Sequence, residues 1–207
     1  MFHKKGLKQS LLGFLAGVLF LAAPQTLSAV PSQTGTDAQV IIPVGWTEYH
    51  ATAGNCSLFM PAEPEHISEK MAMPDEGFEL KYDAYISAAD QQTVFMLLVA
   101  QYPEFVDEAY AQMSLEGFLN GILTHNPGNQ LLFADLLLVD GHEALDFFIR
   151  TGNVYFKGRA VMVKNSLYLM AMECDIPHYD EVRYKNFVDS FKLHQNATAA
   201  NELKSES

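Results

Sequence analysis

Eight consecutive residues near the middle of the chain, Thr93 to Ala100, are almost all apolar and rich in the side chains that strands favour. Such a run without alternation is typical of a strand buried on both faces. It follows a segment, Phe78 to Ala88, in which apolar residues occupy every second position, the pattern of a half-buried strand. A doubly buried strand needs cover on both sides. The chain is therefore predicted to hold a sheet between two layers.

Most of the remaining body also has strand character. Turn residues separate the apolar segments at Asp140-Gly141, Gly152-Asn153 and Lys164-Asn165. Connections this short join only antiparallel neighbours, so an antiparallel sheet is predicted. Its further strands are expected at residues 56–60, 131–139, 143–154, 155–164 and 166–173.

Two segments change to helical spacing. In the first, Leu115, Phe118, Leu119 and Ile122 fall on one helical face, and Ser114 is the expected N-cap. In the second, the same spacing links Tyr184, Phe187, Val188 and Phe191. Asp180 and Glu181 suit the start of that helix, where the helix dipole favours acids, and Pro177 suits its first turn. The predicted fold class is α+β, an antiparallel sheet flanked by helices on both sides.

The N-terminus has the order of a secretory signal peptide. Lys4, Lys5 and Lys8 precede an apolar stretch from Leu11 to Ala23, and a small-residue segment ends at Ala29. Those thirteen residues would rise only about 20 Å as a helix, short of the roughly 30 Å hydrocarbon core of a bilayer. We predict cleavage after Ala29, no stable membrane span after cleavage, and an extracytoplasmic protein that is periplasmic or secreted.

The rest of the chain is expected to form a single domain. Residues 30–44 are rich in Ser, Thr, Gln and Gly without periodicity and predict a flexible tether. Residues 194–207 lack large apolar side chains and predict a disordered tail. The single α+β domain is placed at residues 45–193.

Charge limits the partners. The chain has 25 acidic residues against 13 Lys plus Arg, and removing the three leader lysines leaves 10 − 25 = −15. Phosphate backbones and anionic membrane surfaces repel such a protein, so nucleic-acid binding is excluded.

Two cysteines remain after the leader, Cys56 and Cys174. In an oxidising compartment they are a possible disulfide that would close a long loop. Alternatively, both are buried thiols that act as small apolar residues. Neither lies in a CxxC motif or a Cys/His cluster, so no redox or zinc role is predicted.

Several short motifs together resemble the PsbP/Mog1-like superfamily. They are Leu58-Phe59-Met60-Pro61, Val139-Asp140-Gly141-His142-Glu143-Ala144, Ser166-Leu167-Tyr168-Leu169-Met170 and Phe187-Val188-Asp189-Ser190-Phe191. The resemblance spans about residues 46–193. It implies an α/β/α sandwich around an antiparallel sheet, and a binding or assembly-accessory role rather than catalysis. The family shares no catalytic residues, so none is transferred.

Catalytic patterns are weak. His142-Glu143 with Asp146 is reminiscent of a zinc-protease motif, but the second His is missing and the segment reads as a strand. No nucleophile elbow, phosphate-binding loop or dinucleotide motif occurs. Three pairs of neighbouring carboxylates occur, Asp75-Glu76, Asp107-Glu108 and Asp180-Glu181, and we interpret them as solvated acids. A calcium-binding loop formed by Asp75, Glu76 and Glu79 is the alternative for the first pair. No catalytic residue, metal site or cofactor is predicted.

The sequence therefore favours a non-catalytic exported domain that binds an unknown protein partner or helps to assemble an envelope complex. A small-ligand module with a pocket between sheet and helix is the alternative, and an unrecognised hydrolase is a third hypothesis. Methionines that cluster near a loop could form a binding face, or could fill the core. They are Met71 and Met73, beside Phe78 and Tyr82, with Met162, Met170 and Met172 on the late strands.

Overall fold

The computed structural model describes residues 42–73 and 77–194. The predicted signal peptide, residues 30–41 of the tether and residues 195–207 of the tail lie outside this part. Ten strands are present in it: β1 Thr47–Ala51, β2 Cys56–Met60, β3 Glu65–Met73, β4 Phe78–Ala88, β5 Thr93–Gln101, β6 Asn129–Val139, β7 His142–Thr151, β8 Val154–Val163, β9 Ser166–Asp175 and β10 Lys192–Leu193.

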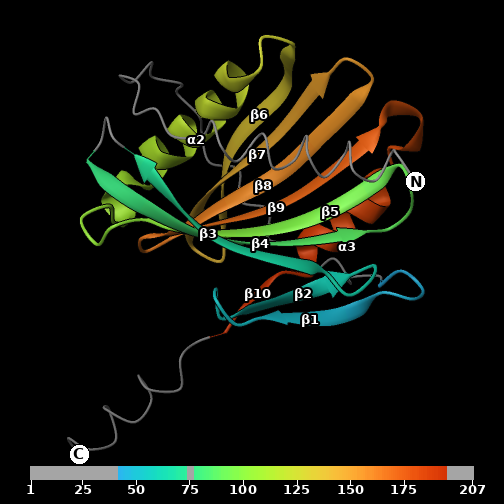
Figure 1. The fold of residues 1–207 in the computed structure, drawn as a ribbon, viewed down its shortest axis with the longest axis horizontal. Helices are drawn as coiled ribbons and strands as arrows, with labels where there is room; N and C mark the ends of the chain where they lie inside the picture. The colour runs from blue at the N-terminus through green and yellow to red at the C-terminus, as the bar shows by residue number, and fades with distance from the viewer. Residues whose placement is uncertain (1–41, 74–76, 195–207) are drawn as a thin grey trace, which may run out of the picture.

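Seven of these strands form one sheet in the order β3-β4-β5-β9-β8-β7-β6, and every neighbouring pair is antiparallel (Figure 1). The strands β5 and β9 are distant in sequence but are neighbours in the sheet, where they pair over almost their whole length. Asp140, Gly141 and Lys164 all have the positive φ angles that two-residue hairpin turns require. The predicted antiparallel sheet with its central buried strand is therefore confirmed.

A second, three-stranded sheet has the order β1-β2-β10. It joins the first described strands to the last, because β2 pairs with β1 on one side and with β10 on the other. His194, which we assigned to the tail, donates its backbone N–H to the Asn55 carbonyl at 2.9 Å. Neither β1, β3 nor β10 was predicted from the sequence, because their side chains are mostly exposed and carry no apolar alternation.

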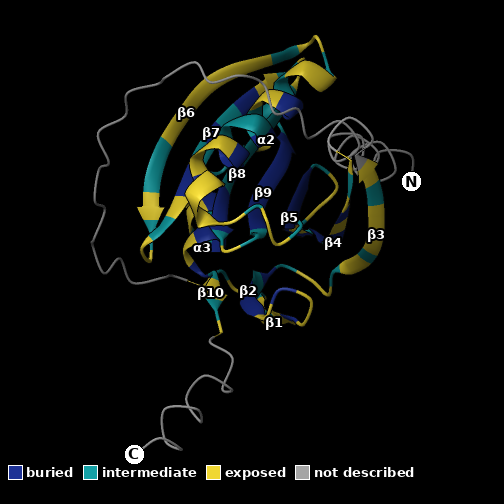
Figure 2. Ribbon diagram, turned by 90° about the vertical axis from the view of Figure 1, so that its left-hand side faces the viewer, coloured by how far each residue is buried: buried dark blue, intermediate teal, exposed yellow. Residues whose placement is uncertain are grey.

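Two apolar cores lie on the two faces of the large sheet. The helix α2, Ala111–His125, covers one face with Leu115, Phe118 and Ile122. The helix α3, Glu181–Asp189, and the small sheet cover the other face. Figure 2 shows the dark blue central strands between these layers. This arrangement is the predicted α+β fold, with helices on opposite sides of the sheet.

Both helices begin differently from the prediction. Ser114 lies inside α2 and is buried, so it is not the N-cap. Asp107 instead accepts a hydrogen bond from the Ala109 N–H and caps a short 3₁₀ turn, η1 Glu108–Tyr110, that leads into the helix. Before α3, Pro177 belongs to a separate 3₁₀ turn, η2 Ile176–His178, and the cap is Asp180. Asp107 lies seven residues before Ser114, and Asp180 lies three residues after Pro177; each Asp accepts hydrogen bonds from free backbone N–H groups that follow it.

Gly158 in β8 tests how tightly this core is packed. A Cβ at this position would lie 2.6 Å from Phe147 Cζ and 3.1 Å from Leu169 Cδ1. Gly158→Ala is therefore expected to lower the free energy of unfolding by about 1–3 kcal/mol, the usual cost of overpacking. Urea unfolding measures the change. Gly128→Ala, where the nearest atom is a side-chain oxygen at 3.3 Å, is the control and should change stability far less. Equal effects of the two substitutions would contradict this packing.

Candidate binding surfaces

The strand β6 forms one edge of the large sheet and leaves a row of apolar side chains in solvent. Four of them are exposed to between 37% and 49% of their area, namely Leu131, Leu132, Phe133 and Leu138. Figure 2 shows β6 as a mostly yellow and teal strand along this edge. In the described part of the chain, β6 pairs with β7 alone. Its outer backbone groups are therefore available to another strand.

The pairing of β6 with β7 is interrupted by a β-bulge. Leu131 faces Ile149 while Phe133 faces Phe148, so Leu132 is an extra residue without a partner across the strand pair. Natural sheets usually protect an edge with lysines, prolines, inward-pointing charges or β-bulges, and of these devices β6 has the bulge at Leu132. The β6 sequence has neither Lys nor Pro, and its one charge is Asp135. We call Leu131, Leu132, Phe133, Asp135 and Leu138 the β6 edge surface.

Charged and aromatic side chains fill the space between β7, β8 and α3. Lys157 lies 4.7 Å from the Tyr184 ring centre and 5.2 Å from that of Phe148. It also donates to Glu181 at 2.6 Å and to the Tyr179 hydroxyl at 3.0 Å. Burial alone would raise the pKa of Glu181, but the hydrogen bonds from Lys157 and Tyr179 and the Lys157 charge outweigh it and lower that pKa. The group holds α3 to the sheet, with the charges of Lys157 and Glu181 paired to each other.

The residues of the zinc-protease-like pattern, for which no metal site was predicted, do not come together. Asp146 accepts two hydrogen bonds from Arg159, at 2.6 and 2.8 Å, which fully engages its carboxylate. His142 lies four residues away along β7, about 13 Å in an extended strand, with its Nδ1 3.9 Å from Glu108. Among the described residues, no group of three His, Cys, Asp or Glu side chains could hold a metal ion.

The other acidic candidates also have local roles. Asp107 and Asp180 are helix caps, and Glu79 forms an ion pair with Lys70 at 3.1 Å. Asp75 and Glu76, the other two residues of the calcium-loop alternative, lie outside the described residues.

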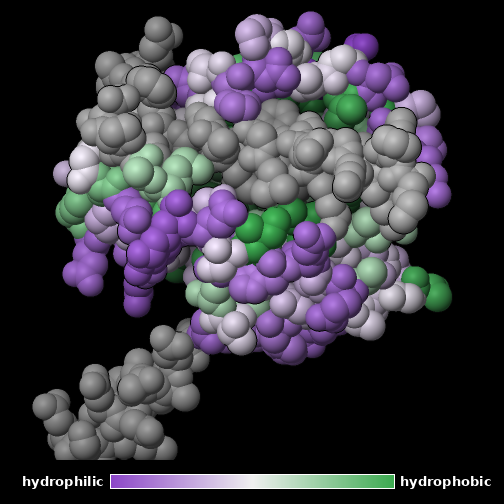
Figure 3. Space-filling view, viewed as in Figure 1, coloured by the Kyte–Doolittle hydropathy of each residue, from purple (hydrophilic) through white to green (hydrophobic). Residues whose placement is uncertain are grey.

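The methionines for which a binding face and a core role were both considered are divided between core and surface. Met162, Met170 and Met172 are buried, as is Tyr82. Met71 and Phe78 are half-buried against the α2-side core, whereas the side chain of Met73 lies outside the described part. Phe105, which is 66% exposed, packs against Phe78 with ring centres 6.0 Å apart. Figure 3 shows the pale apolar surface at the left, over the ends of β3 and β4 and the connection from β5.

The two cysteines are buried free thiols at different ends of the same core. Cys174 is the cross-strand partner of Thr93, whereas the Cys56 sulfur lies beside Gly54, next to the Val99 side chain. Thr93 and Val99 are six residues apart on β5, which is about 20 Å. A disulfide requires Cα atoms about 4.4–6.8 Å apart. The Cys56–Cys174 bond considered from the sequence is therefore not formed in this structure.

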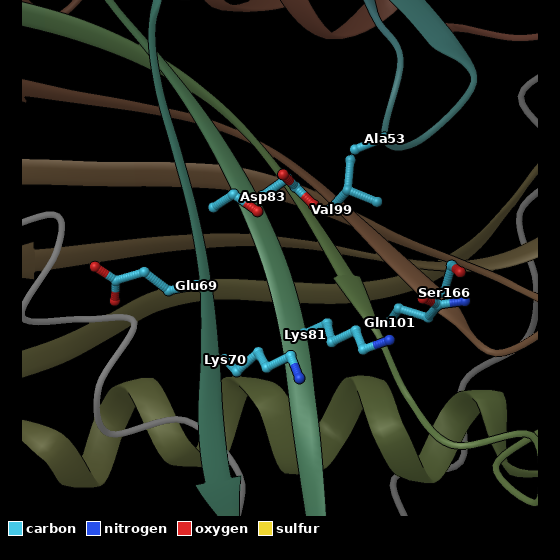
Figure 4. Close-up of a pocket in the computed structure, with 9 residues that line it drawn as sticks. Ala53, Glu69, Lys70, Lys81, Asp83, Val99, Gln101 and Ser166 are labelled. Atoms are coloured by element: carbon cyan, nitrogen blue, oxygen red, sulfur yellow. The ribbon is translucent and has the colours of Figure 1, made fainter.

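A polar cavity of about 320 Å³ lies on the face of the large sheet that also carries the small sheet. Its floor comes from β3, β4, β5 and β9, and Ala53 of the β1–β2 turn forms one wall. The lining side chains are mostly polar: Ser68, Glu69, Lys70, Lys81, Asp83, Gln101 and Ser166, with Val99. Figure 4 shows Lys70, Lys81 and Gln101 extending in one direction across the strands, while Glu69 points away from them. Sequence patterns had placed a possible pocket between sheet and helix, which is a different location.

Comparison with known proteins defines the fold. No family model matches the chain, and no curated protein does. The solution structure of cyanobacterial PsbP (CyanoP) from Synechocystis sp. PCC 6803 is similar over 78% of this chain and 99% of CyanoP, with 14% identity and a TM-score of 0.53. Two further structures show weaker similarity to this chain. A protein from Bacteroides thetaiotaomicron has 6% identity and a TM-score of 0.40, and the match covers 74% of this chain and 50% of that protein. A Pseudomonas aeruginosa protein of unknown function has 13% identity and a TM-score of 0.41, and the match covers 73% of this chain and 99% of that protein.

The chain therefore has a PsbP-like α/β/α fold, as the sequence resemblance implied. At 14% identity the similarity to CyanoP concerns the fold alone. Among the described residues, no helix is both long and apolar enough to cross a bilayer.

The buried thiols predict a loss of stability at alkaline pH. Burial raises the pKa of Cys56 from 9.0 to about 12, and burial with the nearby Asp175 carboxylate does the same for Cys174. Because the unfolded thiols ionise first, stability is complete below about pH 9 and falls as the pH rises toward 12. The loss should be on the order of 1 kcal/mol for each thiol at pH 10. Urea unfolding at pH 8 and pH 10 measures it.

The double variant Cys56→Ala, Cys174→Ala is the control, and it should lose less stability over the same pH interval. In parallel, iodoacetamide at pH 8 should leave the native protein unmodified and add two groups once urea unfolds it. A non-reduced protein that takes up no label even in urea would have a disulfide and would contradict the free thiols.

Proposed function

We propose that this chain is an exported, non-catalytic accessory module that binds an extended segment of another protein at the β6 edge surface. The observation that carries the proposal is an edge strand with four exposed large apolar side chains and no lysine or proline to protect it. A strand added to such an edge gains backbone hydrogen bonds, and the side chains of alternate residues give selectivity.

The energetics favour an apolar partner strand. Leu131 and Phe133 lie on opposite faces of the sheet, since their β7 partners are the neighbouring residues Ile149 and Phe148. An added strand would thus find an apolar contact on each face. Burying a large apolar side chain fully yields about 1.5–3 kcal/mol, and these side chains are already about half-buried, so each contributes roughly half of that.

Charge selects the kind of partner. Asp135 lies near the middle of the edge surface, the exposed Asp140 follows the end of β6, and the exposed Glu143 lies on β7 opposite Leu138. A second copy of this chain would bring the same acids together, in a protein whose expected mature charge is −15. The favoured occupant is therefore a strand of a different protein in which apolar residues alternate with Lys or Arg.

The absence of a converged catalytic group among the described residues supports a binding role, because the candidate acids, histidines and cysteines are occupied or separated. The basic and apolar leader of the sequence supports export.

Two synthetic peptides test the edge surface. One twelve-residue peptide alternates valine with lysine, and the other alternates valine with glutamate. In an NMR titration, the lysine peptide is expected to shift the β6 amides and slow their hydrogen exchange, whereas the glutamate peptide is not. Asp135→Lys should reverse this preference, because it inverts the central charge. Glu63→Lys makes the same charge change at an exposed site on the β2–β3 connection, and should leave the preference intact.

Three results would contradict the proposal. The first is equal binding of the two peptides, and the second is amide shifts centred on β3 instead of β6. The third is a concentration-dependent dimer in analytical ultracentrifugation that Asp135→Lys alters, because the occupant of the edge would then be a second copy of this chain.

Export has its own test. When the full chain is expressed in a bacterium with a general secretion pathway, we expect the mature protein outside the cytoplasm with Val30 as its first residue. Intact mass and N-terminal sequencing measure this directly. Retention of Met1 through Ala29 in a cytoplasmic product would reject export without affecting the β6 edge surface.

A further inference from the structure

The polar cavity exists because the small sheet ends before it covers the whole face of the large sheet. Toward the centre, β2 and α3 bury an apolar core that includes Val99, which is 5% exposed. Beyond Ala53 the same face of the large sheet becomes polar, with Ser68, Lys70 and Lys81 in the floor. A partly open depression of about 320 Å³ remains there. This volume is at the lower end of the range for small-molecule sites, which is roughly 300–1,000 Å³.

Two lysines oppose each other in the cavity floor. Lys70 on β3 and Lys81 on β4 are direct cross-strand partners, an arrangement of like charges that destabilises a strand pair. Glu79 neutralises Lys70 at 3.1 Å. In the part of the chain that the structure describes, no carboxylate lies within 4.0 Å of the Lys81 ammonium. Among the described residues, the Lys81 ammonium therefore has no ion-pair partner, in a protein with almost twice as many acids as bases.

Neutral polar groups surround that charge. Gln101 is the cross-strand partner of Lys81, and Ser166 is the partner of Gln101, so the three residues form a continuous row across β4, β5 and β9. The side chains of Gln101 and Ser166 make no hydrogen bond to another described residue. Asp83, two residues from Lys81 on the same face, accepts a hydrogen bond from His66 at 2.8 Å through one oxygen. The row thus presents donors beside the ammonium group and a carboxylate acceptor close by (Figure 4).

We propose that this cavity binds a small hydroxylated carboxylate, a molecule of the sugar-acid class. Its carboxylate pairs with the Lys81 ammonium, and its hydroxyl groups exchange hydrogen bonds with Gln101, Ser166 and Asp83. The anionic group pairs with the Lys81 ammonium, which has no carboxylate within 4.0 Å among the described residues. The hydroxyl groups match the polar, uncharged side chains of Ser68, Gln101 and Ser166 in the lining. A purely apolar ligand would leave these groups without partners, which is unfavourable.

Glucuronate and glucose form a matched pair of probes, because they share their hydroxyl groups and differ in one carboxylate. In NMR titrations at constant ionic strength, glucuronate is expected to shift the amides of Gln101 and Ser166 and to bind at least about tenfold more tightly than glucose. Inorganic phosphate serves as a third probe that has charge without a carbon skeleton, and it should bind more weakly than glucuronate. Equal affinity for glucuronate and glucose, or phosphate binding as tight as that of glucuronate, would overturn the proposal.

Two lysine variants identify the residue. Lys81→Met should weaken glucuronate binding about tenfold or more, because it removes a charge-assisted hydrogen bond. Lys185→Met removes the same charge from an exposed position on α3, outside the cavity, and should leave the affinity unchanged. An equal loss in both variants would mean that overall charge rather than this cavity attracts the anion. These shifts are read at Gln101 and Ser166, so the result is independent of peptide binding at β6.

Discussion

The pairing of β5 with β9 is the interaction on which the rest of the structure depends. It joins Thr93–Gln101 to Ser166–Asp175, segments separated by more than sixty residues, through nine cross-strand pairs. Almost every side chain of both strands is buried, so each face of this pair must be covered. One face receives α2 and the other receives α3 and the small sheet. Stability of the domain therefore rests on contacts that form only when distant parts of the chain have met, which is typical of slow-folding β-rich proteins.

The cover on the α3 side is partly ionic, and this suits an acidic chain. Lys157 and Arg159 project from β8 toward α3, where Glu181 and Asp189 of the helix and Asp146 of β7 surround them. Arg159 alone contacts two acids, at 2.6 Å and 3.6 Å. Few bases are available in this chain, and here two of them neutralise acids that would otherwise repel one another between sheet and helix. Burial of such pairs brings little net stability, but removing one partner would leave the other charge buried and unpaired, which is strongly destabilising.

The sequence predicted those parts of the fold whose residues are buried in a regular pattern. Phe78–Ala88 was placed to the residue, because alternate side chains enter the α2-side core. The strand β3 was missed since it lies at an edge, where Glu65, His66 and Lys70 are exposed and no alternation is needed. The cavity could not be found either. It depends on Lys81, Gln101 and Ser166 becoming neighbours through cross-strand register, and they are spread over 85 residues of sequence. For a related reason the sequence left a disulfide and two buried thiols as alternatives for Cys56 and Cys174, because sequence separation says nothing about position along a strand.

The two candidate binding surfaces have one structural origin. A seven-stranded sheet is wider than a fifteen-residue helix and a three-stranded sheet can cover, so cover ends at both margins. At the β6 margin, the edge strand exposes apolar side chains and backbone N–H and C=O groups that no described strand pairs with, and these groups suit an extended peptide segment. Near the β3 margin, the uncovered face is polar and carries Lys81, which forms no ion pair with another described residue and suits a small anion. The chemistry differs because β6 exposes an edge, where the backbone is the main recognition element, whereas the cavity exposes a face, where only side chains are available. The same incomplete cover can therefore support two separate binding events on one domain.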